Sequence, residues 1–255
     1  NMTYYGRWTY KLEEAQRQGA AGALVLHNTP AASYGWNVCS TSHVNHNIGL
    51  CSEDMNADAL GFMGWLHEDA GKKLFEMSGL NFEEVTNAAK KPGFKSFTMK
   101  AKSKVTMNVL EMNVGESHNV AAVLPGTDLK DEYIVCTAHW DHLGIGTPIE
   151  GDSIYNGAAD NASGTAALMV LAKKFQSLPV KQRRSIVFLA VTSEECGLLG
   201  SEGYCENPLF PLSKTAVNLN FDGSAPAPRT TGVTLRAAGK TNTDALVVAA
   251  AAAQG

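Results

Sequence analysis

Three almost continuously apolar runs, each followed at once by acidic or imidazole side chains, constrain this chain more than any other feature. The runs lie at residues 133–138, 185–191 and 216–221, and helical patterns at 163–175 and 200–206 alternate with them. Runs that are apolar on both faces suit strands covered by helices on both sides. The pattern therefore predicts an α/β fold, a three-layer sandwich around a mostly parallel, mixed central sheet.

The polar residues that follow these runs are expected to meet at one place. In a parallel sheet, ligands and catalytic groups gather beyond the carboxyl ends of the strands. A glycine-rich loop at residues 143–157 leads from the first run to a further acidic residue at the start of a helical pattern. The candidate site residues are His139, Asp141, Asp160, Glu194, Glu195 and Asp222.

The composition of this group favours a metal centre. One imidazole with several carboxylates and no thiolate suits zinc or a neighbouring divalent metal. Asp160, on a loop between two strand ends, is the natural bridge between two ions. Asp141 is placed to accept the second ring N–H of His139. Adjacent side chains in an extended segment point opposite ways, so one carboxylate of the pair Glu194–Glu195 can bind metal while the other acts as general base.

Each residue also has an ordinary structural interpretation. His139 alone would be a hydrogen-bonded loop histidine, and the glutamate pair a solvated acidic turn. Asp160 would be a helix N-cap and Asp222 a turn residue before a glycine. All four interpretations would have to hold together at strand ends, which disfavours them. For His142, in contrast, packing against the strand end is the preferred interpretation over contact with the site.

Charge and cysteine content narrow the function classes. A net charge of −4 gives no electrostatic reason to expect a nucleic-acid partner. No apolar run is long enough to span a bilayer. The five cysteines form no CxxC pair, so a cysteine-based zinc site is disfavoured. Cys39 and Cys51 flank a polar loop, and a disulfide or two thiols are equally compatible with that spacing.

The segments HWDH, GAADNASG, TSEECGLLGS and NFDG, in this order, resemble the zinc-dependent aminopeptidases of the superfamily that includes glutamate carboxypeptidase and the transferrin receptor ectodomain. The resemblance implies two Zn²⁺ per active site, peptide substrates with a free N-terminus, and a secreted or periplasmic location. It implies that His139 and Asp222 hold the first zinc, that Asp160 bridges, and that Glu195 holds the second. Glu194 would be the general base and Asp141 the partner of His139.

Two further expectations follow from the resemblance. Residues 4–28 resemble the later part of a protease-associated domain, so residues 1–100 are predicted to be a partial, β-rich insert of that kind and 101–255 the peptidase domain. The family's second zinc site is completed by a downstream histidine, but no histidine follows His142 here. Truncation is the simpler explanation and a degenerate second site the other, so this chain is expected to hold its second metal poorly.

Three rival functions remain at the level of sequence. A carboxypeptidase or dipeptidase would use the same metals but needs a basic pocket for the substrate carboxylate. A glutaminyl cyclase-like transferase uses a related sheet with one zinc, against which the Asp160-Asn161 and HWDH segments speak. A non-catalytic receptor-like binding module would have lost its metals, which the retention of Glu194 disfavours.

Overall fold

The computed structural model describes residues 4–42, 48–51, 56–108, 113–223, 239 and 241–253. The chain divides into two compact units, Asn1–Gly115 and Glu116–Gly255. The sequence pattern placed the boundary near residue 100, some fifteen residues earlier. Each unit is described by itself below.

The first unit is a set of short helices beside a small parallel sheet. Strands β1 (Ala23–Leu26) and β2 (Met63–Leu66) pair in parallel, with Ala23 opposite Met63. Gly19 follows the first α-helix with a φ of +73°, a conformation that glycine adopts at little cost and that ends helices. The helical elements are η1 (Tyr4–Gly6), α1 (Trp8–Arg17), α2 (Thr29–Ala32), α3 (Trp36–Ser42), α4 (Glu68–Met77) and α5 (Phe82–Ala89).

Two expectations for this unit are not met in its described part. Residues 97–109 alternate in polarity and predict a strand, but residues 97–108 form none and residue 109 lies outside the description. An alternating segment becomes a strand only when another strand pairs with it. Helices also outnumber strands in the described residues, so a β-rich unit is not seen, and the assignment to a protease-associated domain stays a prediction.

Cys39 is a buried thiol rather than half of a disulfide. Its Sγ lies 3.4 Å from Nδ1 of His27, which is itself only 2% exposed. In the described structure no disulfide joins Cys39 to Cys51. Of the two interpretations that the sequence left open, the structure therefore shows the thiol form.

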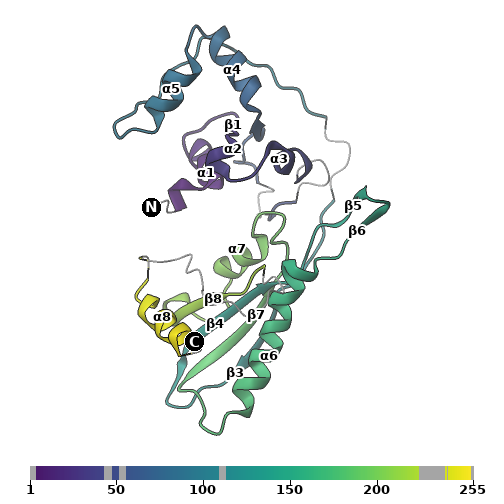
Figure 1. Ribbon diagram of the computed structural model, residues 1–255, viewed down its shortest axis with the longest axis vertical. Coiled ribbons are helices and arrows are strands. Elements are labelled where there is room, and N and C mark those ends of the chain that lie inside the picture. Colours follow the sequence, from purple (N-terminus) through teal and green to yellow (C-terminus); the bar gives the residue numbers. More distant parts are fainter. Residues whose placement is uncertain are drawn as a thin grey trace. The chain divides into compact units, whose positions relative to one another are not determined.

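The second unit is built on a four-stranded mixed sheet (Figure 1). The strand order is β3-β7-β4-β8, with β3 antiparallel to β7 and the other pairs parallel. The mostly parallel central sheet predicted from the apolar runs is thus confirmed. The strands are β3 (Val120–Leu124), β4 (Leu129–His139), β5 (Gly144–Ile149), β6 (Asp152–Tyr155), β7 (Arg184–Val191) and β8 (Thr215–Asn220). The helical elements are η2 (Ala158–Ala162), α6 (Ser163–Ser177), α7 (Leu199–Glu206), η3 (Leu212–Lys214) and α8 (Asp244–Ala252).

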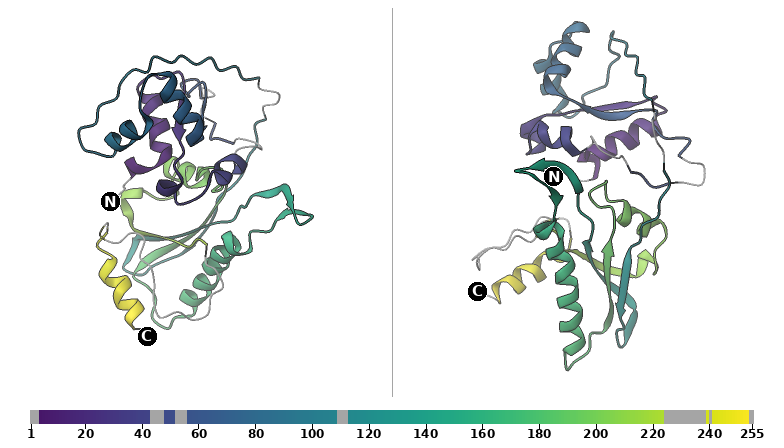
Figure 2. Two further views of the ribbon diagram at one scale, coloured as in Figure 1. Left: turned by 45° about the horizontal axis from the view of Figure 1, so that its top comes forward. Right: turned by 90° about the vertical axis from the view of Figure 1, so that its right-hand side faces the viewer.

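Alternate residues of β4 and β7 enter two separate cores. One face, with Ala138, Ile186 and Phe188, packs against Leu168 and neighbouring residues of α6. The opposite face, with Val187 and Leu189, packs against Tyr204 of α7 and against Phe210. Helices therefore cover both sides of the two central strands, as Figure 2 shows for α6 and α7. This double burial explains why these runs are apolar throughout.

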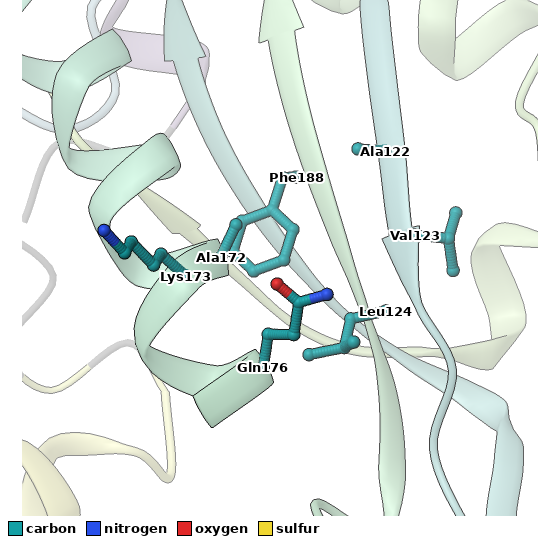
Figure 3. A pocket seen from close by; sticks show the side chains of 7 residues that line it. All are labelled: Ala122, Val123, Leu124, Ala172, Lys173, Gln176 and Phe188. Carbon is teal, nitrogen blue, oxygen red and sulfur yellow. The ribbon is translucent and has the colours of Figure 1, made fainter. Parts of the chain in front are cut away.

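The edges of the sheet are less covered than the sequence suggested. Within the described residues, strand β8 pairs only with β4, and its Leu219 is 41% exposed. Beside the other edge, a shallow hollow opens between β3 and α6, where Phe188 and Gln176 point toward one another (Figure 3). Its lining residues are Ala122, Val123, Leu124, Ala172, Lys173, Gln176 and Phe188, none of them a metal-ligand type, so this hollow is not the candidate site.

The glycine-rich loop contains a β-hairpin that the sequence pattern did not predict. Residues 144–155 form an antiparallel hairpin of β5 and β6, with Ile145 opposite Ile154. Glu150 and Gly151 turn it with φ of +52° and +90°. The hairpin connects His142 to Asp160 in the sequence. Because its two strands are antiparallel, it returns the chain to its starting point, and the two residues lie close together.

No helix among the described residues is long and apolar enough to cross a membrane.

Gly164 fixes how closely α6 approaches the end of β8. A Cβ there would lie 2.2 Å from the carbonyl oxygen of Phe221 and 2.4 Å from Oδ1 of Asn161. Glycine to alanine in a helix ordinarily stabilises by about 1 kcal/mol. At this position the overpacking costs about 1–3 kcal/mol, so we expect Gly164→Ala to lower the thermal midpoint by a few degrees. Met169→Ala, at a 65% exposed site of the same helix, is the control and should change little. A raised midpoint for Gly164→Ala would contradict the close packing.

Candidate metal centre

His139 is the buried centre of the cluster. It is the last residue of β4, and only 2% of it is exposed. Its Nδ1 donates to the main-chain carbonyl of Asp141 at 3.0 Å, which assigns the ring proton of the neutral imidazole to Nδ1. Thr165 of α6 donates its hydroxyl to the carbonyl of His139 at 3.0 Å. The ring is therefore held with Nε2 directed away from the strand.

Asp160 and Asp222 both reach the Nε2 side of this ring. Oδ1 of Asp160 lies 2.9 Å and Oδ1 of Asp222 lies 3.4 Å from Nε2. Asn161, 1% exposed, brings their two segments together: its amide donates to the carbonyl of Phe221 at 2.9 Å and accepts from the N–H of Gly164 at 3.0 Å. The peptide bond between Asp160 and Asn161 is cis.

Asp160 is not the helix cap that its position before α6 allowed. The N-cap residue of α6 is Ala162, with no side-chain capping bond, and Asp160 itself has φ −118° and ψ 95°, outside the helical region. Its carboxylate instead lies beside Nε2 of His139, within the cluster. It belongs both to a group with His139 and Asp222 and to a second group with His142 and Glu195. A carboxylate shared by two groups is the arrangement that a bridging ligand requires.

Glu194 and Glu195 diverge toward different histidines. Oε2 of Glu194 lies 3.9 Å from Nε2 of His139, whereas Oε1 of Glu195 lies 2.7 Å from Nδ1 of His142. Both side chains are largely buried, at 26% and 20% exposed. They do not form the solvated acidic turn that their sequence alone would suggest.

Asp141 contacts the cluster differently from the expectation. Its carboxylate was predicted to accept the ring N–H of His139, but its Oδ1 is 3.7 Å from Nδ1, and the main-chain carbonyl makes that bond instead. The carboxylate accepts the backbone N–H groups of Glu194 at 3.0 Å and of Glu195 at 3.2 Å. Asp141 thus ties the ends of β4 and β7 together.

His142 lies in the cluster, contrary to the prediction that it packs against the strand end. It forms a group with Asp160 and Glu195 whose ligand atoms lie within 4.8 Å of one another. Gly157 makes room for it, since a Cβ there would lie 2.8 Å from Cβ of His142. The sequence signal was available: His142 follows the same strand end as His139, and a glycine stands at the far end of the intervening hairpin.

The donor set fits a divalent cation. Nε2 of His139 is buried and has no hydrogen-bond partner, although carboxylate oxygens of Asp160 and Asp222 lie 2.9 Å and 3.4 Å away. With the proton on Nδ1, the Nε2 lone pair faces two carboxylates, an arrangement that is repulsive unless a cation or a proton lies between them. Two nitrogen donors and four carboxylates suit zinc. Asp160 with His139 and Asp222 would hold one ion, and Asp160 with Glu195 would contribute to a second.

The electrostatics without metal show the same crowding. Burial raises the pKa of the Glu194 carboxyl, and the neighbouring Glu195, Asp222 and Asp141 raise it further, against the opposing effect of His139. Burial also raises the pKa of Glu195, helped by Asp160 and opposed by the hydrogen bond from His142. For His139, burial lowers the pKa, but Glu194, the bond to Asp141 and Asp222 outweigh it, so its pKa is raised. The pKa of each of these three groups is raised, so burial and the neighbouring carboxylates favour their protonated forms.

The model of peptidase family M28 matches residues 119–255 of this chain. The chain belongs to this family of hydrolases. Over 157 residues it is 33% identical to aminopeptidase NAALADL1 of Mus musculus, which covers 58% of this chain and 19% of that protein. Over 108 residues it is 32% identical to aminopeptidase YwaD of Bacillus subtilis, covering 42% and 21%. Two proteins of Pyrenophora species named "probable zinc metalloprotease" are 32–33% identical over 103 residues, which cover 40% of this chain and 22–23% of those proteins.

Solved structures of this family include a peptidase M28 precursor from Shewanella amazonensis. It is 32% identical, covers 41% of this chain and 22% of its own, and superposes with a TM-score of 0.36. A zinc aminopeptidase from Bacillus subtilis is 33% identical over 41% of this chain and 24% of its own, with a TM-score of 0.33. This chain spans only about a fifth of the length of its first curated relatives, at 19% of the two NAALADL1 proteins.

The hydrogen bond between His142 and Glu195 yields a prediction about metal affinity. Partners that orient a metal-binding carboxylate typically contribute 10- to 100-fold to affinity. We expect His142→Phe, which keeps the ring and removes the donor, to weaken binding of a second Zn²⁺ by about that factor in a chelator-competition titration. His118→Phe changes an exposed histidine outside the cluster and serves as control. Equal zinc affinities for the two variants would contradict the role of His142.

Proposed function

We propose that the protein containing this chain is an aminopeptidase that uses two zinc ions to hydrolyse N-terminal residues from peptides. The observation that carries the proposal is the buried, unpartnered Nε2 of His139 facing the carboxylates of Asp160, Asp222 and Glu194. Membership of peptidase family M28 and the aminopeptidase relatives support the reaction class. Zinc bound here supplies a Lewis acid that acidifies a water molecule and polarises the scissile carbonyl.

The protein groups divide the remaining work. His139, Asp160 and Asp222 would hold one ion, and Asp160 and Glu195 would contribute to holding the other, with His142 orienting Glu195. Glu194 takes the proton of the attacking water and returns it to the departing amine. Burial and the adjacent carboxylates raise the pKa of Glu194, which favours uptake of that proton. With cations bound nearby, this pKa would be lower, and the carboxylate would be ionised before the reaction.

The substrate and the setting are part of the same proposal. The relatives include leucine aminopeptidase 2 of Trichophyton equinum, 27% identical over 207 residues, covering 80% of this chain and 37% of that protein. We assign a free α-amino group to the substrate by this similarity, and a secreted or periplasmic location by the resemblance noted from the motifs. The protease-associated character of residues 1–100 belongs to the same set of proposals.

Replacement of Glu194 by Gln tests the general base. Glutamine keeps the shape but cannot take a proton, so kcat of the full-length protein should fall about 10²- to 10⁴-fold. Zinc content, measured by atomic absorption, should stay near the wild-type value. Glu202→Gln changes an exposed glutamate of α7 and should leave kcat unchanged. Near-normal turnover of Glu194→Gln would show that another group is the base.

Substrates with a free and with a blocked N-terminus distinguish an aminopeptidase from a carboxypeptidase. A probable glutamate carboxypeptidase of Arabidopsis thaliana is also similar, 32% identical over 122 residues, 46% of this chain and 16% of that protein. An aminopeptidase should cleave leucine p-nitroanilide and fail on its N-acetyl form. Release of a C-terminal residue from an N-blocked dipeptide would overturn the aminopeptidase proposal while leaving the metal site intact.

A further inference from the structure

The loop that carries Glu194 and Glu195 is closed by its own backbone. It joins β7 to α7, and its two ends are bonded to each other: Gly200 N–H donates to the carbonyl of Thr192 at 3.0 Å. Inside it, Ser193 and Leu198 have φ of +52° and +67°, which non-glycine residues adopt at a cost. Such a conformation persists only where the surroundings hold it in place.

A side chain from outside the loop holds both of its ends. Asn119 Oδ1 accepts the N–H of Thr192 at 3.0 Å, and Asn119 Nδ2 donates to the carbonyl of Gly200 at 2.7 Å. Asn119 stands directly before β3, whose ladder with β7 begins at Val120 opposite Ala190. The side-chain amide of Asn119 therefore continues the hydrogen bonding between β3 and β7 beyond the end of the paired residues, as far as Thr192 and Gly200.

The fit at this point is close. A Cβ on Gly200 would lie 2.2 Å from the carbonyl oxygen of Thr192 and 2.6 Å from Oδ1 of Asn119, so only glycine lets the two ends and the amide meet. Ser117 adds a second tie from the same segment, with its Oγ 2.6 Å from Oγ1 of Thr192. Only an amide offers one acceptor and one donor in this geometry; a carboxylate would accept from Thr192 but face the carbonyl of Gly200 with a second acceptor.

We propose that Asn119 is a positioning residue for the general base: it fixes the loop of residues 192–200 and thereby the place of the Glu194 carboxylate. The inference rests on the proposed function, with Glu194 as base. Asp141 holds the loop at Glu194 and Glu195, and Asn119 holds it at its ends, from the far side of β7. A carboxylate that must meet a water molecule within hydrogen-bond reach depends on such a frame, since a displacement of about 1 Å can cost 10²-fold in rate.

The matched control lies at the opposite end of the same strand pair. Gln182 Nε2 donates to the carbonyl of Pro125 at 3.0 Å, an amide contact just beyond the end of β3 that is remote from the loop. Asn119→Asp and Gln182→Glu each replace the donor nitrogen by oxygen with almost no change in shape. If Asn119 has a purely structural role, Asn119→Asp should behave like the control Gln182→Glu: the melting temperature falls, and kcat per folded molecule does not change.

The test is a double-mutant cycle in the full-length protein, assayed on leucine p-nitroanilide with zinc in excess, so that any loss of metal affinity through Glu195 is removed. Asn119→Asp should lower kcat about 10- to 100-fold with KM within about twofold, and Gln182→Glu should leave kcat unchanged. Combined with Glu194→Gln, Asn119→Asp should cause no further loss, because it acts through the group already removed.

Three results separate the possible failures. If wild type does not cleave the substrate, or Glu194→Gln retains wild-type turnover, the proposed function is wrong and this inference falls with it. If Glu194→Gln is impaired but Asn119→Asp has normal kcat, or the two losses multiply, the inference alone is overturned. If Asn119→Asp does not fold, Asn119→Ala, which removes both bonds without adding charge, is put through the same cycle with the same criteria.

Discussion

The parallel pairing of β4 with β7 and β8 is the constraint on which the candidate site depends. Pairing in this sense places His139, the Glu194–Glu195 loop and Asp222 at one edge, because each follows the carboxyl end of its strand. The pairing is stabilised by two apolar layers, one beneath α6 and one beneath α7. The hydrophobic burial of β4 and β7 thus sets the distances within a cluster of charged groups.

The cluster is electrostatically unfavourable in itself. Several carboxylates surround a half-buried volume next to a buried imidazole, and the pKa values of Glu194, Glu195 and His139 all rise in consequence. These charged side chains stay close together only if the backbone segments that carry them are held rigidly. That rigidity comes from hydrogen bonds to the backbone around the cluster: Asn161 joins the Asp160 and Asp222 segments, and Asp141 and Asn119 hold the glutamate loop. The scaffold thus holds the charges in place, and a bound divalent cation would neutralise them.

Much of this could be predicted from residue types and spacing. Strands β4, β7 and β8 and helices α6 and α7 lie within a few residues of the apolar runs and helical patterns. Short, β-branched apolar runs that alternate with helical patterns favour strands covered by helices. Five of the six candidate site residues end or follow these strands, and Asp160 lies before α6; the structure brings all six together with His142. The prediction of a strand at residues 97–108 was wrong. Alternating polarity shows only that a segment is able to pair with a strand, not that a partner strand is present.

The sequence by itself determined which residue types stand at the strand ends and which strands are central, since both follow from local pattern and from the direction of the chain. Only the tertiary structure decided which partner each polar group takes. Nδ1 of His139 bonds the main chain of Asp141 and not its carboxylate, His142 turns into the cluster, and Asn119 reaches across to residues more than seventy positions away. Such choices depend on differences of about 1 Å between segments distant in sequence. No local periodicity encodes those distances, because they are set by how the two layers of helices pack against the sheet.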